Sequence, residues 1–183
     1  NPYNFSGTPM MANNQSAVFY PANLLFLVLP RDIAWVFYLF LQPVLAAFFT
    51  YIFARSIKLS ILASLFSGIA FGFGLFMASF FEYVFVGHTI LWLPLLLFGA
   101  EKMSGKKPLT GFLIIVLGVT CSFLAGHLQL FFLSFGLFWG YVFLKAVLSR
   151  GDKIVLSPIF VSILAIGLWS FLLSQIFELI HYS

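Results

Sequence analysis

Charged residues are scarce in this chain. Asp, Glu, Lys and Arg make up 8% of its 183 residues, whereas 62% are hydrophobic. A soluble domain carries about 25% charged residues, so this composition excludes an ordinary soluble globular protein. The single cysteine, Cys121, excludes an internal disulfide and a cysteine-based metal site. Metal-binding His spacings, glycine-rich phosphate loops and nucleophile elbows are missing as well, so no motif assigns a metal site or a familiar soluble enzyme.

The sequence has instead a series of long apolar runs. A transmembrane helix needs about 20 mainly apolar residues, and six runs are of about that length. They cover residues 32–54, 59–81, 84–100, 109–125, 128–148 and 153–176. The predicted fold class is therefore all-α, a polytopic transmembrane helical bundle of about six spans over residues 32–183. Pro43 and Pro94 lie inside runs and should kink the helices there.

The gaps between the runs differ in charge. Eight of the nine basic residues fall into three alternate gaps, which hold Arg55 and Lys58, then Lys102, Lys106 and Lys107, then Lys145, Arg150 and Lys153. The other gaps hold Arg31, Asp32, Glu82, His88, His127, Glu178 and His181. Lys and Arg stay in the cytoplasm during membrane insertion, so we expect the second set on the outer side. The basic residues then act as topology determinants and contacts to anionic membrane lipids, and no nucleic-acid partner is indicated.

Residues 1–31 differ from the rest of the chain and are predicted to form an extracytoplasmic loop. They are rich in Asn, Pro and Ser, and Arg31 is their single charged residue. An apolar stretch at 17–29 is too short to span a membrane, so we expect a helix lying in the interface. Asp32 follows as the expected N-cap of the first span. An outer segment that begins mid-loop needs an upstream exporting helix, so we expect an internal fragment of a longer protein, truncated at both ends.

Two spans carry small residues at helical spacing. Ser60, Ser64, Gly68 and Gly72 repeat every four residues in one of them. Gly136 and Gly140 show the same spacing in another. Small residues let membrane helices approach closely, so both stripes are predicted to pack against neighbouring helices.

The outer gaps supply the residues that could carry chemistry. Glu82, His88 and His127 sit in or near tight connections, and Glu178 and His181 lie three residues apart. Their convergence would form a cleft of carboxylates and imidazoles at the membrane boundary. Plainer interpretations stay open, because a His after Gly in a short loop often caps a helix and a Glu in the position of Glu82 often just ends one. Glu101, among lysines, is interpreted as part of a solvated cytoplasmic loop.

Several short motifs resemble the YfhO-like family of bacterial membrane proteins. They are Asn1-Pro2-Tyr3, Gly7-x-Pro9, Asn14-Gln15-Ser16, Phe19-Tyr20-Pro21-x-Asn23-Leu24, His88 with Trp92-Leu93-Pro94-Leu95 and Glu101, Gly126-His127-x-Gln129, and Gln175-x-x-Glu178-Leu179-Ile180 with Ser183. The family is grouped with the GT-C glycosyltransferases. The resemblance implies transfer of a sugar from a polyprenyl-phosphate carrier to an extracytoplasmic acceptor, such as a cell-surface polymer or a lipid, in the plasma membrane of a bacterium. It also implies a key acidic residue upstream of Asn1.

On this hypothesis Glu82, His127 and Glu178 are the catalytic candidates, acting as base, hydrogen-bonding groups or partners of a divalent cation. Asn4, Gln15, Tyr20, His88 and Gln129 are the candidate contacts to sugar or acceptor. A transporter or flippase is the alternative, but it requires polar groups at mid-membrane depth and broken helices, for which Gln42-Pro43 is the main candidate. A non-catalytic membrane scaffold is the third possibility.

Overall fold

The computed structural model describes residues 14–105 and 108–149. Two short 3-10 helices come first, η1 (Asn14–Ser16) and η2 (Pro21–Leu24). The helices after them are α1 (Leu25–Val28), α2 (Arg31–Ser56), α3 (Ile61–Gly72), α4 (Leu75–Ser79), α5 (Val84–Ile90), α6 (Leu93–Met103), α7 (Pro108–Leu124) and α8 (Leu128–Ser149). The described residues contain no strand, which confirms the all-α prediction.

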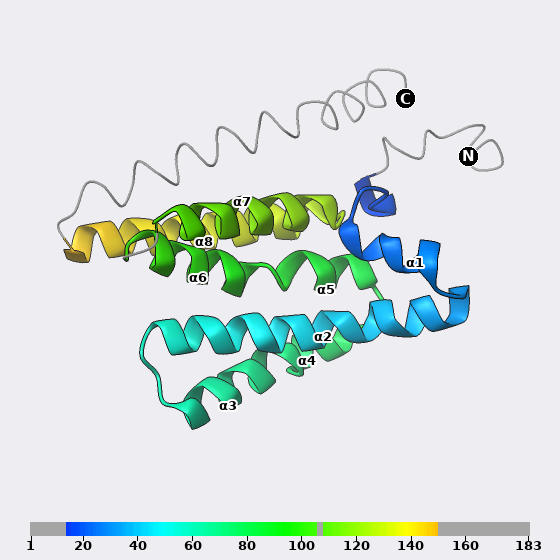
Figure 1. Ribbon diagram of the computed structural model, residues 1–183, viewed down its shortest axis with the longest axis horizontal. Helices are drawn as coiled ribbons and strands as arrows, with labels where there is room; N and C mark the ends of the chain where they lie inside the picture. Colours follow the sequence, from blue (N-terminus) through cyan, green and yellow to red (C-terminus); the bar gives the residue numbers. More distant parts are fainter. Residues whose placement is uncertain (1–13, 106–107, 150–183) are drawn as a thin grey trace, which may run out of the picture.

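The helices run back and forth along one long axis (Figure 1). Four segments are long and apolar enough to cross a membrane: Arg31–Ser56, Ile61–Ser79, Val84–Met103 and Leu128–Leu148. Helix α7 is apolar but shorter, at 17 residues. These segments match five of the six predicted runs, and the run at 153–176 lies outside the described residues.

Two of the predicted spans are interrupted. The second breaks at Phe73-Gly74, between α3 and α4, and the third breaks at Leu91-Trp92, between α5 and α6. Pro94 is therefore near the start of α6 and not in mid-helix, whereas Pro43 lies inside the continuous helix α2. A proline suits the first turn of a helix, where its missing N–H leaves no bond unmade. The helix expected at 17–29 is reduced to η2 and α1, and α1 packs on α2.

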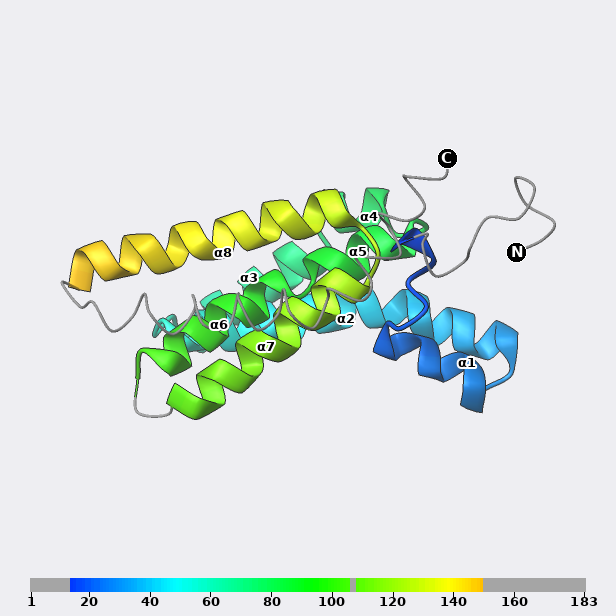
Figure 2. The same ribbon diagram turned by 90° about the horizontal axis from the view of Figure 1, so that it is seen from above.

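Helix α6 lies between α2 and α7, while α3 packs on α2, and α8 contacts α5, α6 and α7 (Figures 1 and 2). Apolar side chains at the centre form two clusters. One surrounds Tyr38, Phe49, Leu91 and Trp92, and the second joins α6, α7 and α8. Many large apolar residues of α2, α3 and α8 are exposed, as expected for helices whose outer surface meets lipid.

The two small-residue stripes behave differently. Ser64, Gly68 and Gly72 are buried against α2, and a Cβ at Gly72 would lie 2.5 Å from the carbonyl oxygen of Pro43. That stripe packs as predicted. At Gly136 and Gly140 a Cβ would meet no atom of the described residues within 4 Å, and the run at 153–176 lies outside them, so close packing of this stripe stays a prediction.

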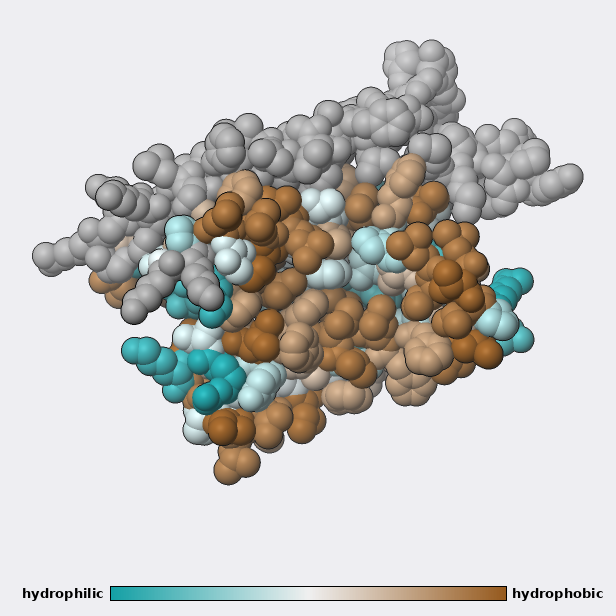
Figure 3. All heavy atoms as spheres, viewed as in Figure 1, coloured by the Kyte–Doolittle hydropathy of each residue, from teal (hydrophilic) through white to brown (hydrophobic). Residues whose placement is uncertain are grey.

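Polar residues gather at opposite ends of the bundle. The turns holding Arg55 and Lys58, and the ends of α6 and α8 with Lys102 and Lys145, lie together; we call this the basic end. The turn holding Glu82, the turn holding His127 and the start of α2 with Asp32 lie at the other end, which we call the acidic end. Hydrophobic residues dominate the surface between the two ends (Figure 3). Asp32 lies in the first turn of α2, where its carboxylate interacts favourably with the helix dipole. The side-chain cap that the sequence predicted for Asp32 is not formed.

Candidate functional site

The acidic end brings the first described segment of the chain onto the α7–α8 turn. Gly126 in this turn has φ +100°, and a Cβ there would lie 2.6 Å from the carbonyl oxygen of Asn14 and 3.2 Å from Cα of Gln15. Glycine adopts this backbone conformation readily and leaves room for the contact. The turn conformation and the contact with Asn14 therefore account for a glycine at position 126. Gln15 lies next to the turn that carries His127.

His127 caps helix α8. Its Nδ1 accepts a hydrogen bond of 3.2 Å from the backbone N–H of Leu130, the geometry of an N-cap side chain. A neutral imidazole that accepts at Nδ1 carries its proton on Nε2. No described residue bonds this Nε2–H, and the ring is only half-buried. His127 thus combines the plain role of a cap with a donor left over for a ligand.

Two ring contacts link the turn that carries Glu82 to His127. The ring of Phe85 stacks on His127 at a centroid distance of 5.7 Å and contacts the ring of Tyr83, the residue after Glu82. Glu82 is exposed in the turn between α4 and α5. Gln129 is exposed in the first turn of α8, two residues after His127. The candidates Asn4 and Glu178, and His181, lie outside the described residues.

His88 is not in an outer connection, as the sequence suggested, but inside α5 and fully buried. Its Nε2 lies 3.1 Å from the backbone oxygen of Tyr38, which can only accept, so Nε2 carries the proton. Its Nδ1 therefore accepts from the Tyr20 hydroxyl at 3.0 Å. Trp92 donates to that same hydroxyl at 3.3 Å. These four residues form a directional chain of hydrogen bonds, the Tyr20–His88 network.

The network fixes the first segment of the chain to the bundle. Tyr20 is buried, and burial raises the pKa of its phenol, which keeps the hydroxyl protonated and able to donate. Since Tyr20 and His88 satisfy each other away from solvent, the structure gives them a structural role. Direct contact with a substrate stays a prediction for both. The apolar run 84–100 already contained His88, and this was the available signal for its burial.

A second polar side chain is buried nearby. Gln42 in α2 is 1% exposed and donates weakly, at 3.4 Å, to the backbone oxygen of Phe81. Its side-chain oxygen has no hydrogen-bond partner among the described residues. An unsatisfied buried amide oxygen is costly, so Gln42 marks a place where a ligand or ordered water would be stabilised.

An apolar pocket of about 440 Å³ lies beside the network. Its lining comes from η2, α1 and α2 together with Trp92, and includes Tyr20, Leu25, Val28, Phe37, Leu41 and Trp92. Aromatic and branched aliphatic walls of this kind suit an apolar chain.

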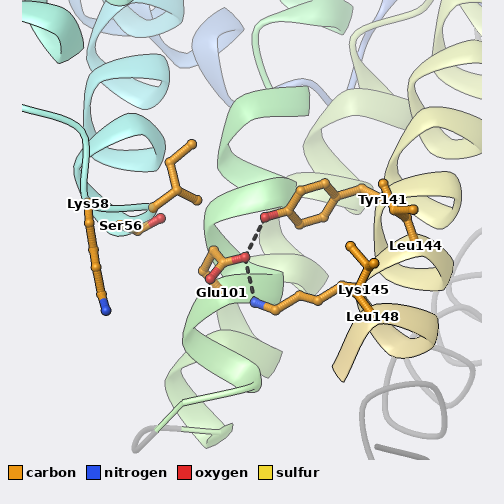
Figure 4. A pocket seen from close by; sticks show the side chains of 8 residues that line it. Ser56, Lys58, Glu101, Tyr141, Leu144, Lys145 and Leu148 are labelled. Carbon is orange, nitrogen blue, oxygen red and sulfur yellow. Dashed lines mark hydrogen bonds and ion pairs between the residues drawn. The ribbon is translucent and has the colours of Figure 1, made fainter. Parts of the chain in front are cut away.

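At the basic end, the prediction for Glu101 is wrong. Glu101 is not in a solvated loop but in the last turns of α6, where its Oε1 accepts from Lys145 at 2.5 Å and from the hydroxyl of Tyr141 (Figure 4). The signal was the i,i+4 spacing of Tyr141 and Lys145, which places both on one face of α8. No group of three or more His, Cys, Asp or Glu suited to a metal occurs among the described residues, so a divalent cation stays a hypothesis.

Comparison with known proteins gives no family for this chain. Neither a protein-family model, nor a curated protein, nor a solved structure matches it. The likeness to YfhO-like proteins therefore stands on the short motifs alone.

Proposed function

We propose that the chain is the membrane-embedded part of a GT-C-like glycosyltransferase in a bacterial plasma membrane. It takes a sugar from a polyprenyl-phosphate carrier and adds it to an acceptor on the outer side, where the acidic end lies. The observation that carries this proposal is the apolar pocket beside Tyr20 and Trp92. A polyprenyl chain is apolar and branched, and the pocket offers it apolar walls close to the polar acidic end.

The residues of the acidic end suit the chemistry of such a transfer. The acceptor hydroxyl must lose a proton as it attacks the sugar, and Glu82 is an exposed carboxylate available as the base. The leaving phosphate gains charge, and a positioned donor stabilises it. The Nε2–H of His127 supplies such a donor, with Gln15 and Gln129 near enough in the fold to contact the sugar. Asn4 and Glu178 belong to the same hypothesis through the resemblance.

The test is sugar transfer by the full-length protein in membranes. Radiolabelled polyprenyl-phosphate hexose is supplied, and label incorporated into the acceptor fraction is measured for the wild type, Glu82→Gln and His127→Ala. Each substitution should lower transfer by about a hundredfold, the usual effect of losing a general base or an anion-stabilising donor. Thr110→Ala, an exposed change at the start of α7, is the control that should leave transfer unchanged. Full transfer by both site variants would refute the roles assigned to them.

A transporter for a lipid-linked or polar substrate is the second candidate. Two spans are broken, and the buried polar side chains of Gln42 and His88 lie close to the break between α5 and α6, the arrangement on which transporters rely. The same membranes distinguish the two functions. A transporter moves the labelled lipid between leaflets without covalent transfer, whereas a transferase incorporates the label.

A further inference from the structure

A second pocket, of about 430 Å³, lies at the basic end between α2, α6 and α8 (Figure 4). Its polar walls are Ser56 and Lys58 on one side and Glu101, Tyr141 and Lys145 on the other, with Leu148 among its apolar residues. It lies at the opposite end of the bundle from the acidic end, so a ligand bound here touches none of the residues assigned to the proposed transferase.

Charge in this pocket is unevenly balanced. The carboxylate of Glu101 is held through one oxygen, Oε1, by both Lys145 and Tyr141. This arrangement fixes Lys145 in the wall and neutralises one positive charge. Across the pocket, Lys58 is exposed and makes no ion pair with any described residue. The described residues that line the pocket thus include two ammonium groups and one carboxylate, and the surplus positive charge favours an anion.

The pocket also has an apolar side. Ile57, Leu144 and Leu148 line it and are 41%, 55% and 76% exposed, facing outward from the bundle. Free inorganic phosphate gains nothing from such a wall, but a lipid does, because its acyl chain covers the leucines while its phosphate reaches the lysines. Basic pockets between transmembrane helices bind anionic headgroups in this way.

We propose that this pocket binds the phosphate of an anionic phospholipid. Lys58 and Lys145 contact the phosphate from opposite walls, and the acyl chain lies along Leu144 and Leu148. The hydroxyl of Ser56 already donates to the backbone oxygen of Phe53 at 2.6 Å, so Ser56 lines the pocket without offering a hydrogen-bond donor to the phosphate.

The experiment measures lipid retained by the full chain in native mass spectrometry. The protein is released from nanodiscs that mix phosphatidylglycerol with phosphatidylcholine. The wild type should keep phosphatidylglycerol, and Lys58→Gln should keep about fivefold less, the effect expected for one lysine near an anionic headgroup. Lys102→Gln is the matched control: this lysine is at the same end, but its Nζ lies 5.1 Å from the ring centre of Phe98 and outside the pocket. It should retain lipid like the wild type.

Two further results decide against the proposal. Equal losses in Lys58→Gln and Lys102→Gln would mean a diffuse surface charge and no site. Displacement of phosphatidylglycerol by inorganic phosphate alone, at the concentration of the lipid, would mean that the apolar wall has no part in binding. Because Lys58 is exposed, the variant should fold, and its melting temperature checks that it does.

Discussion

At the scale of single residues, the Tyr20–His88 network shows how packing determines which groups donate and which accept hydrogen bonds. The chain of donors runs from Trp92 to Tyr20, then to His88, then to the backbone of Tyr38. With a neutral imidazole, the Tyr20 hydroxyl donates its hydrogen to Nδ1 of His88, and each hydrogen bond of the network has one donor and one acceptor. Removing one member leaves its neighbours buried and unpaired.

Tyr20→Phe tests this arrangement. The change keeps the ring but leaves Nδ1 of His88 and the indole N–H of Trp92 without partners, at a cost of about 1–3 kcal/mol. The melting temperature in detergent should fall by roughly 3–9 °C for a chain of this size. Tyr83→Phe is the control, since Tyr83 is 57% exposed and its described contacts are made by the ring. Equal melting temperatures for Tyr20→Phe and the wild type would contradict the network.

The sequence could predict part of this site and not the rest. Gly126-His127 at a tight turn indicated a cap, and the structure confirms that alternative. The partner of His88 was not predictable, because Tyr20 lies 68 residues away and meets it only when the first segment packs against α5. Gln42, likewise, was visible as a polar residue in an apolar run, but its missing partner is a property of three-dimensional packing.

At the scale of helices, apolar runs predicted where the segments lie but not where they break. The length of an apolar run predicts how many residues are kept from water, but it does not predict whether they form one continuous helix. Continuity depends on local residues such as Gly74, which precedes α4, and Pro94, which suits the first turn of a new helix. The two small-residue stripes make the same point: their spacing is alike, but among the described residues only the stripe of α3 meets a neighbouring helix.

A pair of alanine substitutions should therefore have opposite effects. In Gly72→Ala the new methyl would lie 2.5 Å from the oxygen of Pro43 and 2.9 Å from the nitrogen of Ala47, both in the backbone of α2. Separating α2 from α3 should cost about 1–3 kcal/mol. Gly140→Ala meets no atom within 4 Å among the described residues and should gain up to ~1 kcal/mol from helix propensity. Thermal unfolding in detergent measures both, and changes of the same sign would show that the stripes are equivalent.

At the scale of the whole molecule, alternation of charge along the sequence predicted which turns share an end, and the fold confirms that grouping for the turns within residues 14–105 and 108–149, with the exception of His88, which is buried in α5. Each span reverses direction, so every second turn returns to the same end. What the alternation could not predict is that Glu101 and Lys145 join within the basic end instead of facing solvent separately. The two residues are 44 positions apart in the sequence, and the packing of α6 on α8 brings them together.

Orientation in the membrane is tested by thiol labelling from outside intact cells. Cys121 is 4% exposed and is replaced by Ala to give a background without thiols. In that background Glu82→Cys should react with a membrane-impermeant maleimide, while Lys58→Cys should react only after the cells are opened. Labelling of Lys58→Cys in intact cells would show that the bundle has the opposite orientation, and it would place the proposed transfer on the cytoplasmic side.

The indole of Trp92 sits at the joint where α5 ends and α6 begins, and it is also part of the wall of the apolar pocket. An isoprenoid tail that enters beside Tyr20 would press on that joint directly. The angle between the two half-helices would then respond to occupancy. Helix α6 runs from this joint to Met103 and carries Glu101, so a change of that angle would also shift Glu101 relative to Lys145 on α8.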